Sequence, residues 1–387
     1  MVIGHLPAMR IALISRRFDP GGGGTERDLV TTALGLADAG HSVTIYADEI
    51  RATDARLEVR QVPPLRAGRA LRLVNFAFRA PVAARRDGAD VVLSFARAVG
   101  SDVIRSGGGA HRRYVSAAAA WRPPARALAM RLSAYHRAQM LIERRAFAHP
   151  TLRRVVAVSD LVREQLIEDF ALAPGKAATI YNGVDLDRFK PLSDEERRAA
   201  RRQLHLDPNR HAVVFVGSGF ARKGLGFLLR AWPLIKQRPL LLVVGADHEA
   251  YRYRVLAARL GVSEQVSFAG VWPQVERIMG SADVLALPSL FEPFGNVVAE
   301  AMACGVPALV SSRCGVAEWL PGAMRRFVVA DPGDPSQIAA RLEELLDESA
   351  GLRSTVRAIV EPYTWERYRC ALEALLANVA QAGAKRA

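Results

Sequence analysis

The chain has 387 residues, enough for two domains, and half of its residues are hydrophobic and 24% are charged, as in ordinary globular proteins. Its longest apolar runs are only strand-sized, which argues against a membrane-spanning or targeting segment. The three cysteines, Cys304, Cys314 and Cys370, are too few and too far apart for a disulfide framework or a Cys-x-x-Cys motif. We therefore expect a cytoplasmic protein with reduced cysteines.

Positive charge is concentrated in the first half of the chain. The net charge is +14, and residues 51–154 contain 21 Arg, no Lys and six acidic residues, so the rest of the chain is close to neutral. A surface formed by such an arginine-rich stretch would attract the phosphates of a membrane surface, an acidic glycolipid or nucleic acid. Arginine in place of lysine is also what a GC-rich genome produces. No nucleic-acid-binding motif accompanies the excess and aromatic residues make up only 7% of the chain, so a nucleic-acid-binding protein is a rival interpretation and no nucleic-acid partner is expected.

The N-terminal pattern is strand, glycine-rich loop, helix and strand, at residues 10–15, 19–25, 26–39 and 43–47. In the loop, Gly22, Gly23 and Gly24 have no Cβ atom, so backbone N–H groups can approach a diphosphate. Asp48 after the second strand mimics the ribose-binding acid of a dinucleotide-binding fold, which makes an NAD-dependent oxidoreductase an alternative. The third glycine of that fingerprint is missing, because Glu26 follows the loop.

The remainder of the first half alternates strands with helices. Strands are expected at residues 89–94 and 154–160, and residues 103–111 predict a strand that runs into a second glycine-rich loop. Residues 124–148 have apolar side chains at helical spacing with arginines around them and predict one long amphipathic helix, which either packs within the domain or lies against an anionic membrane. Ser159 is expected to cap the helix that follows the strand at 154–160.

The alternation resumes with a strand at residues 211–217, a loop at 218–224 and a helix at 225–235. Arg222 and Lys223 at the mouth of this helix are placed to neutralise a diphosphate leaving group without a metal. Asp185 and Asp187 form an Asp-x-Asp pair of the kind that can hold a divalent ion. The pair lies in a linker rather than after a buried strand, so we expect no metal site.

The most informative stretch is residues 288–307, where a loop follows a short buried strand and Gly295 opens a helix that ends at Gly305. The free N–H groups of a helix start favour a phosphate, while Glu292 in the loop can accept hydrogen bonds from sugar hydroxyls and Glu300 in the helix from a ribose. Beyond it we expect a last parallel strand at residues 307–311 and helices at 335–349 and 365–381. Strand, glycine loop and helix in both halves predict an α/β protein of two doubly wound, Rossmann-like domains with ligand between them.

These motifs resemble one known family. The run Phe-Glu-Pro-Phe-Gly-Asn-Val-Val-Ala-Glu-Ala-Met-Ala-Cys-Gly-Val-Pro, with Glu292 and Glu300 eight positions apart, resembles the donor-site signature of the retaining glycosyltransferases of family four. Similar landmarks are Gly-Gly-Thr-Glu-Arg-Asp at residues 23–28, Asn-Gly-Val-Asp at 182–185 and Arg-Lys-Gly at 222–224. The resemblance covers nearly the whole chain and implies the GT-B fold, in which two Rossmann-like domains face each other across a cleft.

The resemblance also implies a role for each domain. Residues 1–183, joined by the C-terminal helix 365–387, would bind the acceptor, and residues 184–364 would bind the donor. His111 is the polar candidate for the residue that contacts the transferred hexose in this family. The nucleotide sugar would be held by the glycine loop and the following residues of the second domain: Gly217, Arg222, Lys223, Gly270, Val271, Phe294, Gly295, Asn296, Val297 and Glu300.

From the resemblance we expect a retaining, metal-independent hexosyltransferase that needs no cofactor and moves glucose from UDP-glucose to a sugar acceptor such as the lipopolysaccharide inner core. No protein nucleophile is evident, so the leaving phosphate itself would take the proton of the acceptor. Some transferases of the lipopolysaccharide core carry Asp where Gly108 stands here, so a transferase of the same fold that acts on another glycan or glycolipid is an alternative. The basic first half would hold the protein on the inner face of the cytoplasmic membrane.

Overall fold

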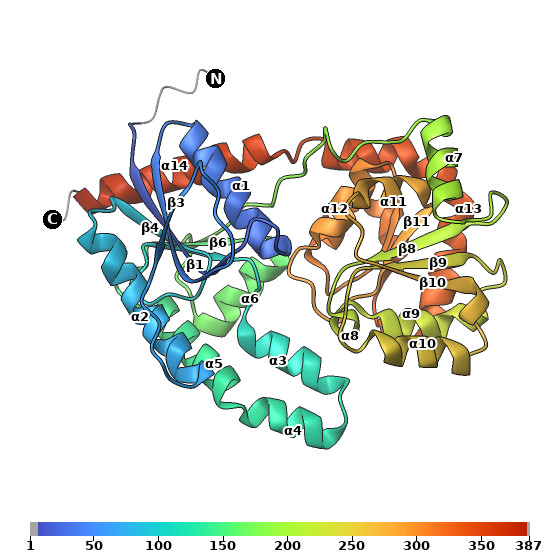
Figure 1. Ribbon diagram of the computed structural model, residues 1–387, viewed down its shortest axis with the longest axis horizontal. Coiled ribbons are helices and arrows are strands. Elements are labelled where there is room, and N and C mark those ends of the chain that lie inside the picture. The colour runs from blue at the N-terminus through green and yellow to red at the C-terminus, as the bar shows by residue number, and fades with distance from the viewer. Residues whose placement is uncertain (1–6, 385–387) are drawn as a thin grey trace. The chain divides into compact units, whose positions relative to one another are not determined.

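The computed structural model describes residues 7–384 and divides into two compact units (Figure 1). The first unit comprises Met1–Gly183 and Trp365–Ala387, and the second comprises Val184–Thr364. Each unit is a parallel β-sheet with helices on both faces. This arrangement confirms the α/β class of two doubly wound, Rossmann-like domains predicted from the sequence.

The first unit contains a seven-stranded parallel sheet in the order β3-β2-β1-β4-β5-β6-β7. Its strands are β1 (Arg10–Phe18), β2 (Ser42–Ile50), β3 (Glu58–Gln61), β4 (Val91–Ser94), β5 (Val103–Ser106), β6 (Arg154–Ala157) and β7 (Ala177–Thr179). Its helices are α1 (Gly24–Asp38), α2 (Arg69–Arg86), α3 (His111–Ala120), α4 (Pro124–Leu132), α5 (Ala134–Ala148), α6 (Asp160–Phe170) and α14 (Trp365–Ala384). The predicted cap of α6 is confirmed, because the side chain of Ser159 accepts a hydrogen bond from the backbone N–H of Val162 at 3.1 Å.

The core on one face of this sheet is completed by the last helix of the chain. Tyr368, Leu372 and Leu376 of α14 are buried in one cluster with Leu13 of β1 and Leu29 of α1. Burial of large apolar side chains is the main favourable term in folding, so the first unit depends on a segment that follows the second unit in the sequence. A separate cluster on β1, β2, β4 and α2 forms a second core of the unit.

The second unit contains a six-stranded parallel sheet in the order β10-β9-β8-β11-β12-β13. Its strands are β8 (Ala212–Val216), β9 (Leu240–Val244), β10 (Val266–Gly270), β11 (Val284–Leu287), β12 (Ala308–Ser311) and β13 (Val328–Val329). Its helices are α7 (Asp194–Gln203), α8 (Phe220–Lys223), α9 (Leu225–Ala231), α10 (Ala250–Arg259), α11 (Val275–Ser281), α12 (Asn296–Ala303) and α13 (Pro335–Val360). Every residue of β8 is buried, as expected for an inner strand covered on both faces.

The prediction of one helix over residues 124–148 was wrong, because the chain breaks at Ser133 into α4 and α5. Ser133 has an extended backbone, with ψ at 122°, which ends the hydrogen bonding of the first helix. Serine is a common boundary residue since its hydroxyl competes with the helix for backbone groups. The break separates two surfaces: Leu128 and Leu132 on α4 are 57% and 62% exposed, whereas Ile142 on α5 is buried.

Other boundaries also differ from the sequence predictions. The helix expected at 225–235 is divided between α9 and a 3₁₀ turn at Trp232–Leu234, where Pro233 lacks the N–H that an α-helix would need. The helix expected to end at Ser349 continues to Val360. The strand at Ala308–Ser311 is not the last, because the two residues of β13 pair with it.

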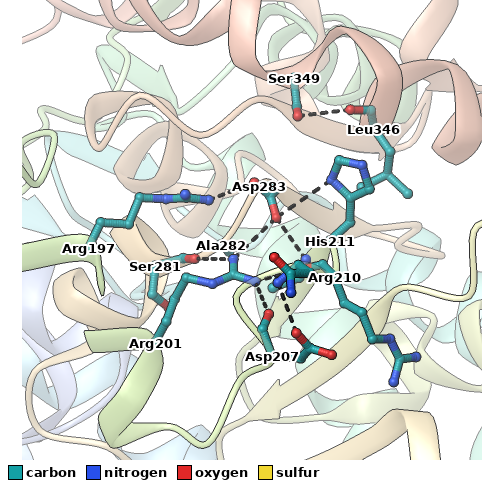
Figure 2. A network of polar contacts seen from close by, with 12 residues as sticks. Arg197, Arg201, Asp207, Arg210, His211, Ser281, Ala282, Asp283, Leu346 and Ser349 are labelled. Atoms are coloured by element: carbon teal, nitrogen blue, oxygen red, sulfur yellow. Dashed lines mark hydrogen bonds and ion pairs between the residues drawn. The ribbon is translucent and has the colours of Figure 1, made fainter. Parts of the chain in front are cut away.

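A buried charge network at the start of β11 fixes α7 to the second unit (Figure 2). Asp283 accepts hydrogen bonds from Arg197 at 2.6 Å, from the backbone N–H of Ala212 at 2.8 Å and from Arg201 at 3.4 Å. The Arg201 side chain is only 6% exposed, and burial lowers its pKa, an effect that Asp283 opposes. Since Arg201 also donates to the carbonyls of Ser281, Asp207 and Arg210, the guanidinium joins the end of α11 to the connection between α7 and β8.

We expect Asp283→Ala to lower the free energy of unfolding by about 3–5 kcal/mol, because it leaves the buried Arg201 without its counterion. Glu348→Ala is the matched control: Glu348 forms an ion pair with Arg326 in which both side chains are more than 40% exposed. Exposed pairs contribute about 0–1 kcal/mol. Urea unfolding of both variants measures the difference, and equal losses would contradict a special role for the buried network.

Candidate functional site

The centre of the candidate site is a carboxylate held between two cations. Glu292 lies in the loop between β11 and α12, and its Oε2 atom is 2.8 Å from Nη1 of Arg222 and 3.0 Å from Nζ of Lys223. The backbone of Glu292 is fixed on both sides, because its N–H donates to the carbonyl of Arg313 and its carbonyl accepts from Gly315, each at 3.0 Å. The sequence placed these three charged side chains in one site, and the structure brings them together.

The two cations keep Glu292 ionised. Burial alone would raise the pKa of this carboxyl, but the charges and hydrogen bonds of Lys223 and Arg222 more than offset burial and lower the pKa to about 2. Because the folded-state pKa lies below the usual value of about 4.3, the pairing stabilises the fold above that pH and the contribution is lost as pH falls toward 2. At neutral pH the cluster of two cations and one anion carries a charge of +1.

Arg222 and Lys223 lie on the single turn α8, not in an open loop as the sequence suggested. This turn is positioned by Asp247, which sequence reasoning did not single out. One carboxylate oxygen of Asp247 accepts from the backbone N–H of Phe220, the first residue of α8, at 2.8 Å, and the other accepts from Glu249 at 2.7 Å. Asp247 follows β9, the strand beside β8, so the end of β9 holds α8 and its two cations in place.

Two glycines allow the close packing of this site. Gly217 has φ at 138°, and a Cβ atom there would lie 2.4 Å from Cε of Lys223. The aliphatic part of the Lys223 side chain therefore packs against position 217 only because that residue is glycine. Gly295 has φ at 104° and is the N-cap residue of α12, where a Cβ atom would lie 2.8 Å from Sγ of Cys314. Any side chain at either position would displace a predicted site residue or the start of α12.

The other predicted donor residues differ in how accessible they are. Gly270 ends β10 with φ at 71°, and the adjacent Val271 is 73% exposed and open to a ligand. Phe294 and Val297 are buried, and the ring of Phe294 packs edge-on against Trp319 with centroids 5.0 Å apart. These two side chains therefore support the loop that carries Glu292 and the start of α12 from within the core. Asn296 and Glu300 lie on α12 and are half-buried.

The site residues of the second unit gather at one edge of its sheet. The segments that carry them follow the carboxyl ends of β8, β9, β10 and β11, which are neighbouring parallel strands. In open α/β sheets, ligands bind outside the carboxyl ends of the strands. This edge of the second unit thus combines two cations, exposed backbone at Gly270 and the start of α12, which are features that suit an anionic ligand.

In the first unit, the glycine-rich loop connects β1 with α1 as predicted. Gly23 is the N-cap residue of α1, and the N–H of Gly22 donates to the carbonyl of Asp19 at 2.9 Å. Gly24 is the first residue of the helix. Asp48, the residue that suggested a dinucleotide fold, is buried and forms an ion pair with Arg72 at 3.0 Å. Its carboxylate is therefore not open to a ribose.

His111 was expected in a loop but begins α3 and is buried. Its backbone N–H donates to Glu143 at 3.0 Å, and its Nε2 atom lies 3.0 Å from Nδ1 of His136. Burial lowers the pKa of His111 to about 4, and the nearby charges of Arg97 and His136 act in the same direction. The imidazole of His111 is therefore neutral at physiological pH. It can donate or accept a hydrogen bond, but it does not supply a positive charge.

A second buried arrangement in the first unit was not predicted. The guanidinium of Arg105, 1% exposed, donates to Asp28 at 2.8 Å and to Asn182 at 2.6 Å, and it lies over the ring of Phe95 at 4.9 Å. Asp28 and Asn182 belong to the two motifs singled out at residues 23–28 and 182–185. The structure thus explains both motifs as partners of one buried arginine at the end of β5.

Within residues 7–384 the structure places no three His, Cys, Asp or Glu side chains where they could hold a metal ion. Asp185 of the Asp-x-Asp pair instead accepts from the backbone N–H of Arg188 at 3.0 Å. The same part of the chain has no helix with the length and apolar character needed to span a bilayer. Cys304 and Cys314 are buried free thiols, and burial raises the pKa of Cys304 to about 12.

Two family models match this chain, one in each unit. Residues 22–188 match the family described as glycosyltransferase family 4, and residues 196–363 match the family described as glycosyl transferases group 1. Two parallel-sheet units of this kind define the GT-B class of glycosyltransferases. Together, the two models and the fold support a glycosyltransferase of the family-4, GT-B type.

Individual relatives agree with this assignment. An uncharacterized glycosyltransferase of Methanocaldococcus jannaschii is 31% identical over 223 residues, which are 55% of this chain and 57% of that protein. The chain spans about half the length of this and several other curated relatives that it matches. The lipopolysaccharide glucosyltransferase WaaG of Escherichia coli is 25% identical over 333 residues, 84% of this chain and 87% of WaaG.

Solved structures show the same fold. A crystal structure of WaaG matches with a TM-score of 0.80 at 22% identity, over 95% of this chain and 99% of that one. HepE of Anabaena, solved in complex with UDP and glucose, matches with a TM-score of 0.73 at 19% identity, over 96% of this chain and 100% of that one. None of these comparisons supports the NAD-dependent oxidoreductase that Asp48 had suggested.

We expect Asp247→Ala to raise the Kd for UDP about fivefold, because a lost cap of about 1 kcal/mol lets α8 and its two cations shift. Asp247→Asn should be intermediate, since its amide keeps one acceptor oxygen for two backbone donors. His248→Ala is the control, because its side chain is 90% exposed beside Asp247. Calorimetry measures the affinities, and an Asp247→Ala variant that binds UDP as well as the His248 control would disprove the positioning role.

Proposed function

We propose that the protein is a retaining glycosyltransferase that transfers glucose from UDP-glucose to a sugar acceptor of the lipopolysaccharide-core type. The observation that carries this proposal is the Glu292, Arg222 and Lys223 cluster at the carboxyl edge of the second sheet. Support for the donor comes from the likeness to HepE, which was solved with UDP and glucose, and support for the acceptor from the likeness to WaaG. A transferase of the same fold with another glycan or glycolipid acceptor is the alternative.

The charges suit the departure of a nucleoside diphosphate. As the bond between the sugar C1 and the diphosphate breaks, negative charge develops on the leaving oxygen, and Arg222 and Lys223 are positioned to stabilise it. The cations are supplied by the chain itself, so we propose a metal-independent reaction that uses no cofactor beyond the donor substrate. The acceptor oxygen bonds to C1 on the face that the diphosphate leaves, and its proton passes to a phosphate oxygen.

Glu292 and Glu300 take different parts in this proposal. The ionised Glu292 would accept hydrogen bonds from hydroxyls of the transferred hexose and support positive charge at C1. Glu300, in the second turn of α12, would bind the ribose, which is the same in substrate and product. His111 is neutral and buried, so its proposed contact with the hexose is through a hydrogen bond and not through charge.

We expect Glu292→Gln to reduce kcat by about 100-fold or more, equivalent to about 2.7 kcal/mol, because it removes a charge that acts in the transition state. Its affinity for UDP should not fall, since the substitution leaves both cations in place. Glu300→Gln should instead weaken UDP binding, because the ribose contact is lost in every bound state.

Transfer and UDP binding are measured for both variants in excess EDTA, where the wild type should remain active. Near-normal turnover of Glu292→Gln, unchanged UDP affinity of Glu300→Gln, or a wild type that needs Mg²⁺ or Mn²⁺ would each overturn the corresponding assignment.

We also propose that the protein works in the cytoplasm, bound peripherally to the inner face of the membrane through its first unit. Helix α4 supports this, because Leu128 and Leu132 are 57% and 62% exposed, and Arg126 and Arg131 on the same helix are also exposed. Exposed apolar side chains among arginines are the features that bring a helix to an anionic interface.

In vesicle sedimentation we expect binding to rise with the fraction of anionic lipid and to fall as salt shortens the screening length to about 8 Å. The double variant Leu128→Ser and Leu132→Ser should bind more weakly, because it loses apolar insertion but no charge. Equal binding of the wild type to neutral and anionic vesicles would show that the arginine excess does not direct the protein to membranes.

A further inference from the structure

A groove in the first unit lies away from the residues described above. It is lined by the second half of α2, the connection from β4 to β5, the end of α5 and the connection from α5 to β6. These connections lead into the amino ends of β5 and β6, whereas the glycine-rich loops follow the carboxyl ends of β1 and β5. The groove is therefore at the opposite edge of the sheet from those loops, and its volume is about 500 Å³.

One half of the groove is apolar. Phe78, Pro81 and Val82 of α2 face Val99 and Ala148 across it. Val82 is 59% exposed, and Ala148 at the end of α5 is also exposed. Apolar surface left in water costs about 25 cal/mol per Å², so a site of this kind gains free energy when a hydrocarbon covers it.

The other half is cationic. A second hollow of about 530 Å³ shares Arg85, Pro150 and Thr151 with the first and adds Arg153 and Arg154. Asp102 is the acidic residue of this lining, and it is already engaged, with Arg85 at 3.1 Å and with the backbone N–H of Val92 at 2.9 Å. Three arginines, Arg85, Arg153 and Arg154, thus line this hollow with one aspartate that is already paired, and Arg145 lines the adjoining groove.

Arg145 is the cation that α5 contributes to the groove. It lines the apolar groove, it is exposed, and within residues 7–384 it has no hydrogen-bond or ion-pair partner. Its guanidinium is available for a bidentate contact with a phosphate, the geometry for which arginine is preferred over lysine. Arg153 adds charge nearby while one of its nitrogens donates to the carbonyl of Val379 at 2.8 Å.

We propose that this groove binds an anionic phospholipid, with an acyl chain against the apolar half and the phosphate against the arginines. A sugar fits the lining of this groove less well, because the groove contains no carboxylate that could bind hydroxyl groups and one half of it is hydrocarbon. The proposal deepens the peripheral membrane association proposed above, and it is independent of the transfer reaction. It gives that association a defined lipid site on α2 and α5, separate from α4.

The test uses a soluble lipid rather than a vesicle, so that binding in the groove is measured apart from adsorption to a surface. Dihexanoyl phosphatidylglycerol is titrated below its micelle concentration into the full chain and followed by calorimetry. Glycerol phosphate supplies the head group alone, and dihexanoyl phosphatidylcholine supplies the same chains without net charge. We expect the phosphatidylglycerol to bind at least about tenfold more tightly than either. Equal affinities for the two phospholipids, or for the lipid and its head group, would overturn the proposal.

Two neighbouring arginines on α5 provide a matched pair of variants. Arg144 and Arg145 are both exposed, but only Arg145 lines the groove. Arg145→Ala should weaken phosphatidylglycerol binding about tenfold and Arg144→Ala should not, whereas a general charge effect would weaken both equally. Ala148→Trp, at an exposed position on the groove wall, should block binding without unfolding the chain.

Melting temperatures verify that all three variants are folded. Unchanged binding by Arg145→Ala or by a folded Ala148→Trp variant would rule out this site. If vesicle binding persists in that case, adsorption through α4 is retained and only the groove is excluded. Neither result bears on glycosyl transfer, which these measurements do not involve.

Discussion

The buried carboxylate of Glu292 would be protonated or expelled from its loop if Lys223 and Arg222 did not compensate for its burial. That balance joins elements from distant parts of the second unit. The loop after β11 carries the anion and α8 carries the cations, so neither can move without leaving a charge unpaired. The supporting contacts follow from this requirement: Asp247 caps α8, and Gly217 leaves room for the lysine stem. The ion pairs and the backbone geometry of the site therefore favour the same arrangement.

Sequence reasoning found the residues that act through local motifs and missed those that act through distant backbone groups. Arg222, Lys223 and Glu292 stand in short runs between a strand and a helix, and that position together with the family resemblance suggested a site for a diphosphate and a sugar. Asp247 could not be found in this way, because its partner is a backbone N–H at Phe220, 27 positions earlier. His111 was placed in a loop, since the glycines before it gave no sign that α3 begins at that residue. The fold class was predictable because buried strands are continuous apolar runs that alternate with helices. The break at Ser133 and the two-residue β13 were not, because neither leaves a periodic pattern.

The arginines of the first half serve more than one physical purpose, which their number alone did not reveal. Arg105 is a buried structural cation whose partners come from α1 and from the segment after β7. Arg113 joins α3 to α6 through Asp169, whose side chain is 2% exposed. Arg144 and Arg145, by contrast, are exposed on the outer side of α5. A region of uniform composition is thus divided by the fold into arginines that hold elements together and arginines that face solvent and remain available to a partner.

The discontinuity of the first unit affects the order in which the protein can fold during synthesis. Tyr368, Leu372 and Leu376 complete the core beside β1, yet they follow the whole second unit in the sequence. At a translation rate of about 5–20 residues per second, some 180 intervening residues take roughly 10 to 40 seconds to make. Throughout that interval one face of the first sheet is covered by α1 without α14, while the second unit, being continuous, can fold without delay. Apolar side chains of the first unit therefore remain exposed until α14 is synthesised. The unit whose synthesis begins first is thus the last to complete its core.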